Sequence, residues 1–307
     1  MKSIFVITGQ TATGKTAYAL ELAKQMNGEL INADSRQIYK KMNIVTGKDL
    51  HQTDGNFIKI NNINNGDIGY FEVPFSNTKL WLYDIIDPKY NFSAHDYKKC
   101  ALNAIEHILQ HNKIPIIVGG SYLYIKNLLF DTVDIHVPPN EKLRIELSGL
   151  PVKKLQTKLS NINPTILDTM NKSDLNNPHR LIRKIEIETT QKSSIKKPSS
   201  PLSDEYKVEI IGFRHKNIQD LGKIIEKRVI ERIQAGAIEE TQGLLQYGYT
   251  LESPGLNAIG YRQIISFLEG AITMQNMIQE WTTKEIQYAK RQHTFMKQNK
   301  DIAWTEL

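Results

Sequence analysis

The stretch GQTATGKT, residues 9–16, fits the phosphate-binding P-loop pattern at every fixed position. Four residues separate its two glycines, and Lys-Thr follows the second glycine. Before it, SIFVIT (3–8) is a short apolar, β-branched run that predicts a buried strand, and after it AYALELAKQM (17–26) predicts a helix. Strand, loop and helix in this order are the context that the motif requires. The stretch predicts a bound phosphate chain, and leaves open whether that chain is transferred, hydrolysed or released.

The P-loop supplies its ligand with backbone amides and two side chains. The residues expected to hold the phosphates are Gly9, Gln10, Thr11, Ala12, Thr13, Gly14, Lys15 and Thr16. Their backbone N–H groups wrap the phosphates, and the following helix adds its positive N-terminal end. Lys15 places a charge against the terminal phosphates, and the Thr16 hydroxyl is expected to bind Mg²⁺.

Short apolar runs alternate with helical patterns around this motif. Further strands are predicted within 28–35, 79–87, 113–120 and 206–213, and a helix over 93–110. This alternation favours an α/β fold: a P-loop NTPase-like parallel sheet with flanking helices. Residues 54–78 alternate around an Asn-Gly pair and predict a hairpin-like elaboration.

One segment departs from the α/β pattern. Residues 131–204 read as polar helices and proline-bearing loops, closing in a Lys/Ser/Pro-rich segment (191–204) that is expected to be mobile. Strand-like sequence resumes after it. We therefore predict a core of residues 1–130 plus 205–307, whose part after 215 is mostly helical, and an inserted, mainly helical domain.

Composition sets few further bounds. Lys and Arg number 39 against 33 for Asp and Glu, a net charge of +6, which permits a polyanionic partner without requiring one. The single cysteine, Cys100, excludes an intrachain disulfide and a cysteine-built zinc site. The P-loop follows the N-terminus too closely for a signal peptide, and no apolar run approaches the roughly 20 residues of a membrane span. We expect a cytoplasmic protein.

Polar residues at predicted strand ends are the candidates for chemistry. Asp34 ends the strand after the P-loop helix, so it is either a general base facing the ligand or a cap for the next helix. Asp84 and Asp87 could hold Mg²⁺ as a Walker-B-like group; alternatively, Asp87-Pro88 is simply a turn. Ser121 follows two glycines at a strand end and is expected to point its hydroxyl into the crevice.

Arg180 and Arg183 lie three residues apart on a predicted helix, and therefore on one face of it. Two arginines on one face suit contacts with an RNA backbone. A solvated surface is the alternative.

Six segments together resemble the tRNA dimethylallyltransferases, also called isopentenyl-tRNA transferases. They are GQTATGKT (9–16), INADSRQIYKKMNIVTGK (31–48), IPIIVGGSYLYIKNLL (114–129), NNPHRLIRKIE (176–186), AIGYRQI (258–264) and AKRQHTF (289–295). The resemblance implies transfer of a dimethylallyl group from dimethylallyl diphosphate to the exocyclic N6 amine of the adenosine immediately 3′ of the anticodon in certain tRNAs. The P-loop would then hold a diphosphate leaving group with Mg²⁺, and no phosphoryl group would be transferred.

The resemblance also assigns roles by position. Asp34 matches the general base, and Lys15, Ser121 and Arg144 match further catalytic positions; Ser121 stands where the family usually has Thr, and both supply a hydroxyl. The residues matching contacts to the tRNA anticodon stem-loop are Asp34, Ser35, Arg36, Gln37, Ser121, Arg144, His179, Arg180, Leu181, Ile182, Arg183, Asn257, Gly260, Tyr261 and Arg262. Asn257 replaces an arginine that is typical of the family. A monomer is expected.

Three other functions compete with this one. A P-loop nucleoside or nucleotide kinase gives no reason for the segments HRLIR (179–183) and GYRQ (260–263). An adenylate prenyltransferase would use the same donor without needing the insertion. An RNA-binding module with a vestigial P-loop is disfavoured by the intact Lys15, Thr16 and Asp34.

Overall fold

A computed structural model of the protein describes residues 2–48, 50, 53–130, 137–190 and 202–307. Most of the Lys/Ser/Pro-rich segment predicted to be mobile lies outside the described residues. The chain forms two compact units, one of Met1–Leu129 with Leu202–Leu307 and one of Phe130–Pro201. We call them the P-loop unit and the helical unit.

The P-loop unit is built on one eight-stranded sheet. Its strands are β1 (Ser3–Gly9), β2 (Gly28–Asn32), β3 (Phe57–Ile63), β4 (Gly66–Glu72), β5 (Lys79–Trp81), β6 (Ile114–Val118), β7 (Lys207–Arg214) and β8 (Ile302–Glu306). Their order is β3-β4-β5-β2-β6-β1-β7-β8. Pairing is parallel from β5 to β8, so the predicted parallel α/β sheet is confirmed.

The two edges of the sheet differ in how well the sequence predicted them. β3 and β4 pair antiparallel, and Asn64 and Asn65 take positive φ values of 49° and 64° at the turn, which confirms the predicted hairpin. At the other edge β8 pairs with β7, although the sequence predicted mostly helix after 215. Most of that part is helical as predicted. The strand at 302–306 was not predicted, because an exposed edge strand carries little apolar alternation.

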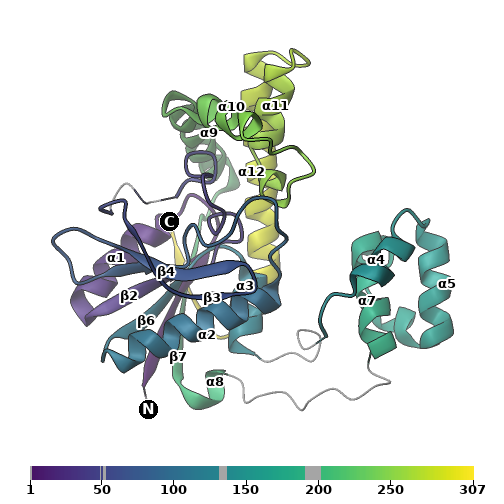
Figure 1. The fold of residues 1–307 in the computed structure, drawn as a ribbon, viewed down its shortest axis with the longest axis horizontal. Coiled ribbons are helices and arrows are strands. Elements are labelled where there is room, and N and C mark those ends of the chain that lie inside the picture. The colour runs from purple at the N-terminus through teal and green to yellow at the C-terminus, as the bar shows by residue number, and fades with distance from the viewer. Residues whose placement is uncertain (1, 49, 51–52, 131–136, 191–201) are drawn as a thin grey trace. The chain divides into compact units, whose positions relative to one another are not determined.

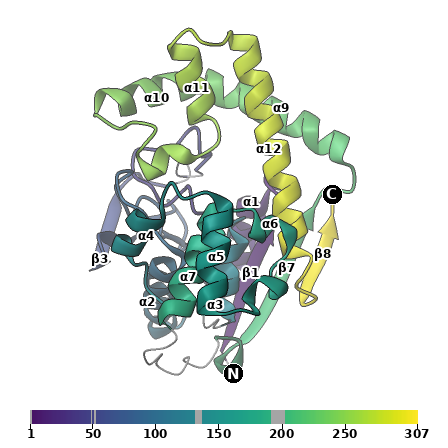
Figure 2. The same cartoon turned by 90° about the vertical axis from the view of Figure 1, so that its right-hand side faces the viewer.

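Helices cover the sheet and extend beyond it. The P-loop unit contains α1 (Lys15–Met26), α2 (Ala94–Gln110), α3 (Tyr122–Leu129), α8 (Leu202–Glu205), α9 (Ile218–Gln234), α10 (Ala237–Gln246), α11 (Tyr261–Leu268) and α12 (Met274–Met296). Ser93 and Asp96 form the capping box that begins α2. Helices α9–α11 gather beyond the end of the sheet opposite the N-terminus, and α12 runs from them back to the sheet (Figures 1 and 2). No helix in the described part of the chain is long and apolar enough to cross a membrane.

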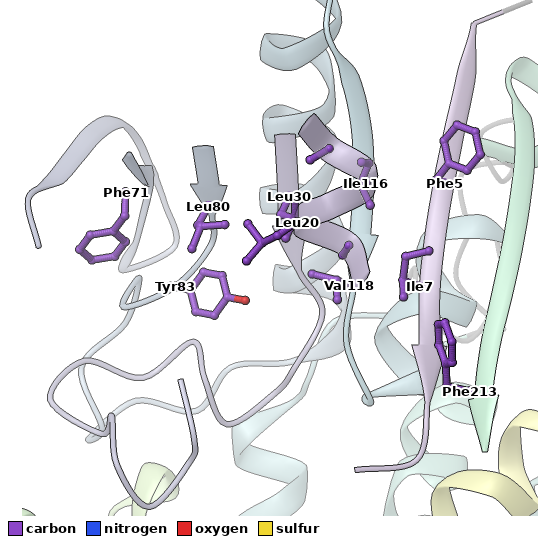
Figure 3. Close-up of a cluster of buried hydrophobic side chains, with 12 residues drawn as sticks. Phe5, Ile7, Leu20, Leu30, Phe71, Leu80, Tyr83, Ile116, Val118 and Phe213 are labelled. Carbon is purple, nitrogen blue, oxygen red and sulfur yellow. The ribbon is translucent and has the colours of Figure 1, made fainter. Parts of the chain in front are cut away.

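Alternate side chains along each strand point to opposite faces of the sheet, so the sheet contributes to an apolar core on each face. Phe5 and Ile7 of β1 pack with Leu20 of α1 and with Ile116 and Val118 of β6, and Figure 3 draws these five side chains as sticks. The alternate residues of β1, Ile4 and Val6, are also fully buried and therefore face the opposite side of the sheet. Burial on both faces is typical of a parallel sheet.

The helical unit has a core of its own. It contains α4 (Glu141–Leu147), α5 (Val152–Ile162), α6 (Lys172–Leu175) and α7 (Pro178–Thr190), with a 3₁₀ turn at Ile166–Thr169. Leucines and isoleucines at helical spacing form its apolar cluster: Leu147, Leu155, Leu159, Ile166, Leu181 and Ile185.

Candidate active site

Three neighbouring strands bring the predicted site residues to one place. β2, β6 and β1 lie side by side and run parallel, so their carboxyl ends meet at the same edge. The P-loop follows β1, Asp34 follows β2, and Ser121 follows β6. Ligands of open α/β sheets bind in the crevice at this edge.

Two glycines explain the shape of the P-loop. Gly14 precedes α1 with φ +70°, a left-handed conformation that costs a glycine little. Gly9 has φ +135°, and a Cβ there would meet the carbonyl oxygen of Phe213 on β7 at 2.1 Å. The loop thus needs both glycines: Gly14 for the left-handed turn, and Gly9 for the close approach of the neighbouring strand β7.

The loop encloses a pocket of about 440 Å³, the P-loop pocket. Its lining includes the loop residues Thr11 to Thr16, with Asp34 and Gln37 from the segment after β2. The ammonium group of Lys15 donates to the carbonyl oxygen of Gln10 and to the hydroxyl of Thr13, 3.3 Å away. Lysine, threonine and carboxylate side chains therefore line one cavity, a set of groups that suits a phosphate ligand.

Residues 35–38 form a turn and not the helix that Asp34 was considered to cap. The Oδ1 atom of Asp34 accepts a hydrogen bond of 2.8 Å from the backbone N–H of Arg36, so Asp34 does shape the following turn. Its second carboxylate oxygen has no hydrogen-bond partner among the residues that the structure describes. Because the side chain lines the P-loop pocket, this oxygen is available to accept a proton there.

Ser121 is held against the segment that carries Asp34. Its hydroxyl accepts from the backbone N–H of Ser35 at 2.9 Å and donates to the Ser35 hydroxyl at 3.0 Å. Ser121 lines a second cavity of about 570 Å³, the aromatic pocket, with Tyr39, Phe92 and Phe295 among its walls. A third cavity of about 370 Å³, the side pocket, lies against Asp34, Arg36 and Asn257.

Helices α9 and α12 contribute site residues that sequence reasoning missed. Arg228 and Arg232 of α9, and Tyr288 and Gln292 of α12, all line the P-loop pocket. Gln292 accepts from the backbone N–H of Thr11 at 2.8 Å and donates to the carbonyl oxygen of Gly120 at 3.0 Å, which joins α12 to the loop. The pattern of a long polar helix carries no signal that the helix meets the P-loop.

Not every predicted tRNA contact presents a side chain. Tyr261 is fully buried and donates to Glu240 at 2.7 Å, so it supports the fold and offers no surface to RNA. Gly260 packs against Trp281 with φ +106°. By contrast, Arg262 is exposed and donates to Asn257 at 3.2 Å.

The remaining predicted contacts lie in the helical unit, where most are engaged with neighbours. Arg144 donates to both carboxylate oxygens of Glu186, at 2.7 and 3.0 Å. Arg183 donates to Glu186 at 3.0 Å and to the carbonyl oxygen of Val137 at 2.7 Å. Burial acts to raise the pKa of Glu186, but hydrogen bonds from Arg144, the Asn140 backbone and Arg183 outweigh it and lower that pKa.

Further residues of this segment differ in exposure. Arg180 is exposed and forms an ion pair with Asp174, and His179 is exposed beside it, whereas Ile182 is half-buried. Leu181 is fully buried in the apolar cluster. The tRNA contact inferred for Leu181 is therefore corrected to a core role, because the helical period turns it inward.

The Asp84–Asp87 pair does not line the P-loop pocket. Asp84 forms an ion pair with the fully buried Lys48. Asp87 accepts from the backbone N–H of Lys89 and from the Tyr249 hydroxyl, each at 2.9 Å. The turn alternative describes Asp87, and Asp84 belongs to a buried ion pair.

Two family models match the chain: "Isopentenyl transferase" over residues 2–69 and "IPP transferase" over residues 72–299. The second match alone spans most of the sequence. The chain belongs to the IPP transferase family. It is 35% identical over 303 residues to the tRNA dimethylallyltransferase of Endomicrobium trichonymphae, an alignment that covers 97% of this chain and 93% of that one.

Solved structures agree with this membership. A tRNA isopentenylpyrophosphate transferase from Bacillus halodurans is 27% identical, with a TM-score of 0.66 and coverage of 99% of this chain and 89% of that one. A tRNA isopentenylpyrophosphate transferase from Staphylococcus epidermidis is 28% identical, with a TM-score of 0.64 and coverage of 100% and 93%. A eukaryotic dimethylallyltransferase acting on tRNA is 23% identical with a TM-score of 0.74, a likeness of fold. The IPP transferase architecture thus extends over the whole chain.

Proposed function

We propose that the protein transfers a dimethylallyl group from dimethylallyl diphosphate to the N6 amine of the adenosine immediately 3′ of the anticodon in certain tRNAs, releasing diphosphate. The observation that carries the proposal is the shared P-loop pocket, in which Lys15, Thr16 and Asp34 face one cavity. The diphosphate of the donor and Asp34, the proton acceptor, would then lie in the same pocket. Full-length similarity to tRNA dimethylallyltransferases supports the same assignment.

The reaction breaks one bond and forms another at the same carbon. The allylic C–O bond breaks, and its electron pair leaves with the diphosphate. Lys15 and the P-loop, with Arg228 and Arg232, line the cavity where that negative charge grows. Arg232 also donates to Glu285 at 3.0 Å. Preorganised positive charge of this kind is commonly the largest contribution to catalysis.

The new bond uses the lone pair of the adenine N6 amine, which is a poor nucleophile until it loses a proton. Asp34 accepts that proton as the C–N bond forms. The hydrogen bond from Arg36 to Oδ1 fixes the orientation of the carboxylate and leaves its other oxygen for the proton. Arg36 thus helps to position the base.

The oxygen donors at this edge fit Mg²⁺. No group of three or more His, Cys, Asp or Glu side chains that could hold a metal occurs among residues 2–48, 50, 53–130, 137–190 and 202–307. Mg²⁺ is commonly bound by few protein oxygens together with substrate phosphates, so the Thr16 hydroxyl and the donor diphosphate are a suitable set. When bound, the ion would neutralise charge on the leaving diphosphate.

A tRNA must present its base outside the anticodon stack to reach the P-loop pocket. The aromatic pocket lies against Ser121, whose partner Ser35 is the neighbour of Asp34, and it is suited to a flat base. We assign the exposed cations Arg180 and Arg262, with His179, to contacts with the anticodon stem-loop. The protein would act as a monomer.

Purified protein and labelled dimethylallyl diphosphate, supplied with tRNA, AMP or ATP in separate reactions, test the assignment. Label should enter tRNA alone. Transfer to AMP would replace the assignment by an adenylate prenyltransferase, and phosphorylation of a nucleoside by ATP would replace it by a kinase. An RNA-binding module would retain tRNA and transfer nothing.

A further inference from the structure

One side chain stands where three cavities at the carboxyl edge of the sheet meet. The P-loop pocket, the aromatic pocket and the side pocket each include Tyr288 in their walls, and no other described residue is common to all three. Tyr288 projects from α12 and is half-buried. Helix α12 is anchored there, since Gln292, one turn later, bonds to the P-loop.

The contacts of Tyr288 place its ring beside the reacting groups. Its phenol lies near the Ser121 hydroxyl, and burial together with the nearby carboxylate of Asp34 raises its pKa. The phenol therefore stays protonated at neutral pH and cannot serve as the base. What remains is the ring itself, which forms a wall between the cavity for diphosphate and the cavity for a base.

In the proposed reaction, a wall at this position can decide which nucleophile reaches the allylic carbon. As the C–O bond breaks, positive charge grows on the allylic carbon, and any nucleophile nearby can take that carbon. The amine of adenine gives the modified tRNA, with its proton passing to Asp34. Water gives dimethylallyl alcohol and diphosphate, with one proton released. A site open on three sides would favour water, because water is far more abundant than tRNA.

We propose that the Tyr288 ring closes the donor side of the site, so that the allylic carbon reacts with the tRNA amine and not with water. The face of an aromatic ring also attracts the positive charge that builds on that carbon. The proposal rests on the function proposed above, and adds that Tyr288 controls which acceptor takes the prenyl group. Excluding water from a reactive intermediate is an established role of enclosed sites.

The test follows both products of one labelled donor, prenylated tRNA and dimethylallyl alcohol, in wild type, Tyr288→Phe, Tyr288→Leu and Tyr288→Ala. Tyr247→Leu is the matched control, because Tyr247 is exposed and lines none of these three cavities. We expect the ratio of alcohol to prenylated tRNA to rise roughly tenfold in the Ala and Leu variants, which is a change of about 1.4 kcal/mol in the difference between the two barriers. The Phe variant, which retains the ring, and the control should keep the wild-type ratio.

The outcomes separate this inference from the proposed function. Wild-type transfer to tRNA decides the function by itself. The inference falls if the ratio stays at the wild-type value in both Leu and Ala variants, or if both variants form neither product, since a purely structural role lowers the two products together. A rise of the ratio in Tyr288→Phe would also overturn it, because the hydroxyl and not the ring would then be the barrier.

Discussion

The P-loop unit and the helical unit use charged side chains in opposite ways. In the P-loop unit, Lys15 and Asp34 follow strand ends and line a cavity that a ligand can enter. In the helical unit, Arg144 and Arg183 both donate to Glu186, whose side chain is fully buried. Lys15 and Asp34 thus face a cavity, whereas Arg144 and Arg183 join α4 and the segment before it to α7 within the helical unit.

This difference shows why a basic motif alone does not identify an RNA contact. Two arginines three residues apart share a helical face, yet Arg180 is exposed and Arg183 is turned toward Glu186. The position of a counter-charge elsewhere in the unit decides which of them is available. Variants that remove one charge at a time can therefore test whether the two units differ in function as they do in structure.

The largest effect is expected at Asp34. Asp34→Asn keeps an oxygen that can accept from the Arg36 N–H and so preserves the turn, but it removes the proton acceptor. We expect kcat for tRNA prenylation to fall roughly 10²–10⁴-fold, the usual loss for a general base, with tRNA binding unchanged. Single-turnover kinetics and a tRNA binding titration measure the two quantities.

Asp54→Asn is the matched control for Asp34→Asn. Asp54 also accepts a backbone N–H two residues on, from Asn56 at 3.0 Å, but it is exposed and lines none of the three cavities. Its rate should equal that of wild type. A near-wild-type kcat in Asp34→Asn would assign Asp34 to the turn alone.

Replacing Lys15 should have the next largest effect. Lys15→Met removes positive charge from the P-loop pocket while keeping a long side chain. Because the lost interaction strengthens as diphosphate leaves, kcat should fall by about 10²-fold and donor binding should weaken. Lys24→Met, on the exposed face of the same helix, is the control. Equal rates in the two variants would remove Lys15 from catalysis.

The sequence predicted those parts of the site that are encoded by neighbouring residues in one continuous segment. The P-loop, the strand that precedes it and the position of Asp34 at the end of β2 are all encoded within single segments. Parallel strands then bring their carboxyl ends together without further information. For this reason the α/β fold followed from pattern alone, and the pattern also placed Asp34 at the edge that carries the P-loop, without deciding where its side chain points.

The sequence did not predict contacts made by helix surfaces across the fold. Arg228 and Tyr288 lie on helices whose polar faces look solvated in sequence, and only the packing of α9 and α12 turns them toward the P-loop pocket. Tyr261 shows the reverse, since its motif indicated a contact and tertiary packing buries it on Glu240. Which face of a helix is buried depends on the elements that pack against it, and these elements can be distant in the chain.

Glu186 should show a smaller effect, on stability rather than rate. Glu186→Ala removes the acceptor of Arg144, Arg183 and the Asn140 N–H, and should lower the stability of the helical unit by about 2 kcal/mol. Hydrogen exchange of residues 137–190 in the full chain measures it. Glu146→Gln, an exposed partner of Lys158, should change protection little.

The pH dependence of that stability has a definite sign. The pKa of Glu186 lies below its ordinary value of 4.5, so the native state favours the carboxylate. Its contribution is complete above that value and is lost as pH falls through the lowered pKa. Wild type should lose protection of the helical unit on acidification more steeply than Glu186→Ala. Parallel profiles would show that the carboxylate is not linked to folding.

The smallest effect, and the one that bears most directly on the contrast between the units, is expected at Arg180. If Arg180 grips a tRNA phosphate, Arg180→Ala should weaken binding of every tRNA substrate alike, since phosphate contacts carry no sequence information. The slope of log binding constant against log salt concentration should become shallower by about 0.7–0.9.

Adding Arg183→Ala should change the slope little, because Glu186 and the Val137 carbonyl hold that guanidinium. Asp174→Asn frees Arg180 from its ion pair and should strengthen binding. Binding titrations of an anticodon stem-loop at several salt concentrations separate the cases. An unchanged slope in Arg180→Ala would mean that the helical unit contacts tRNA through other residues or not at all.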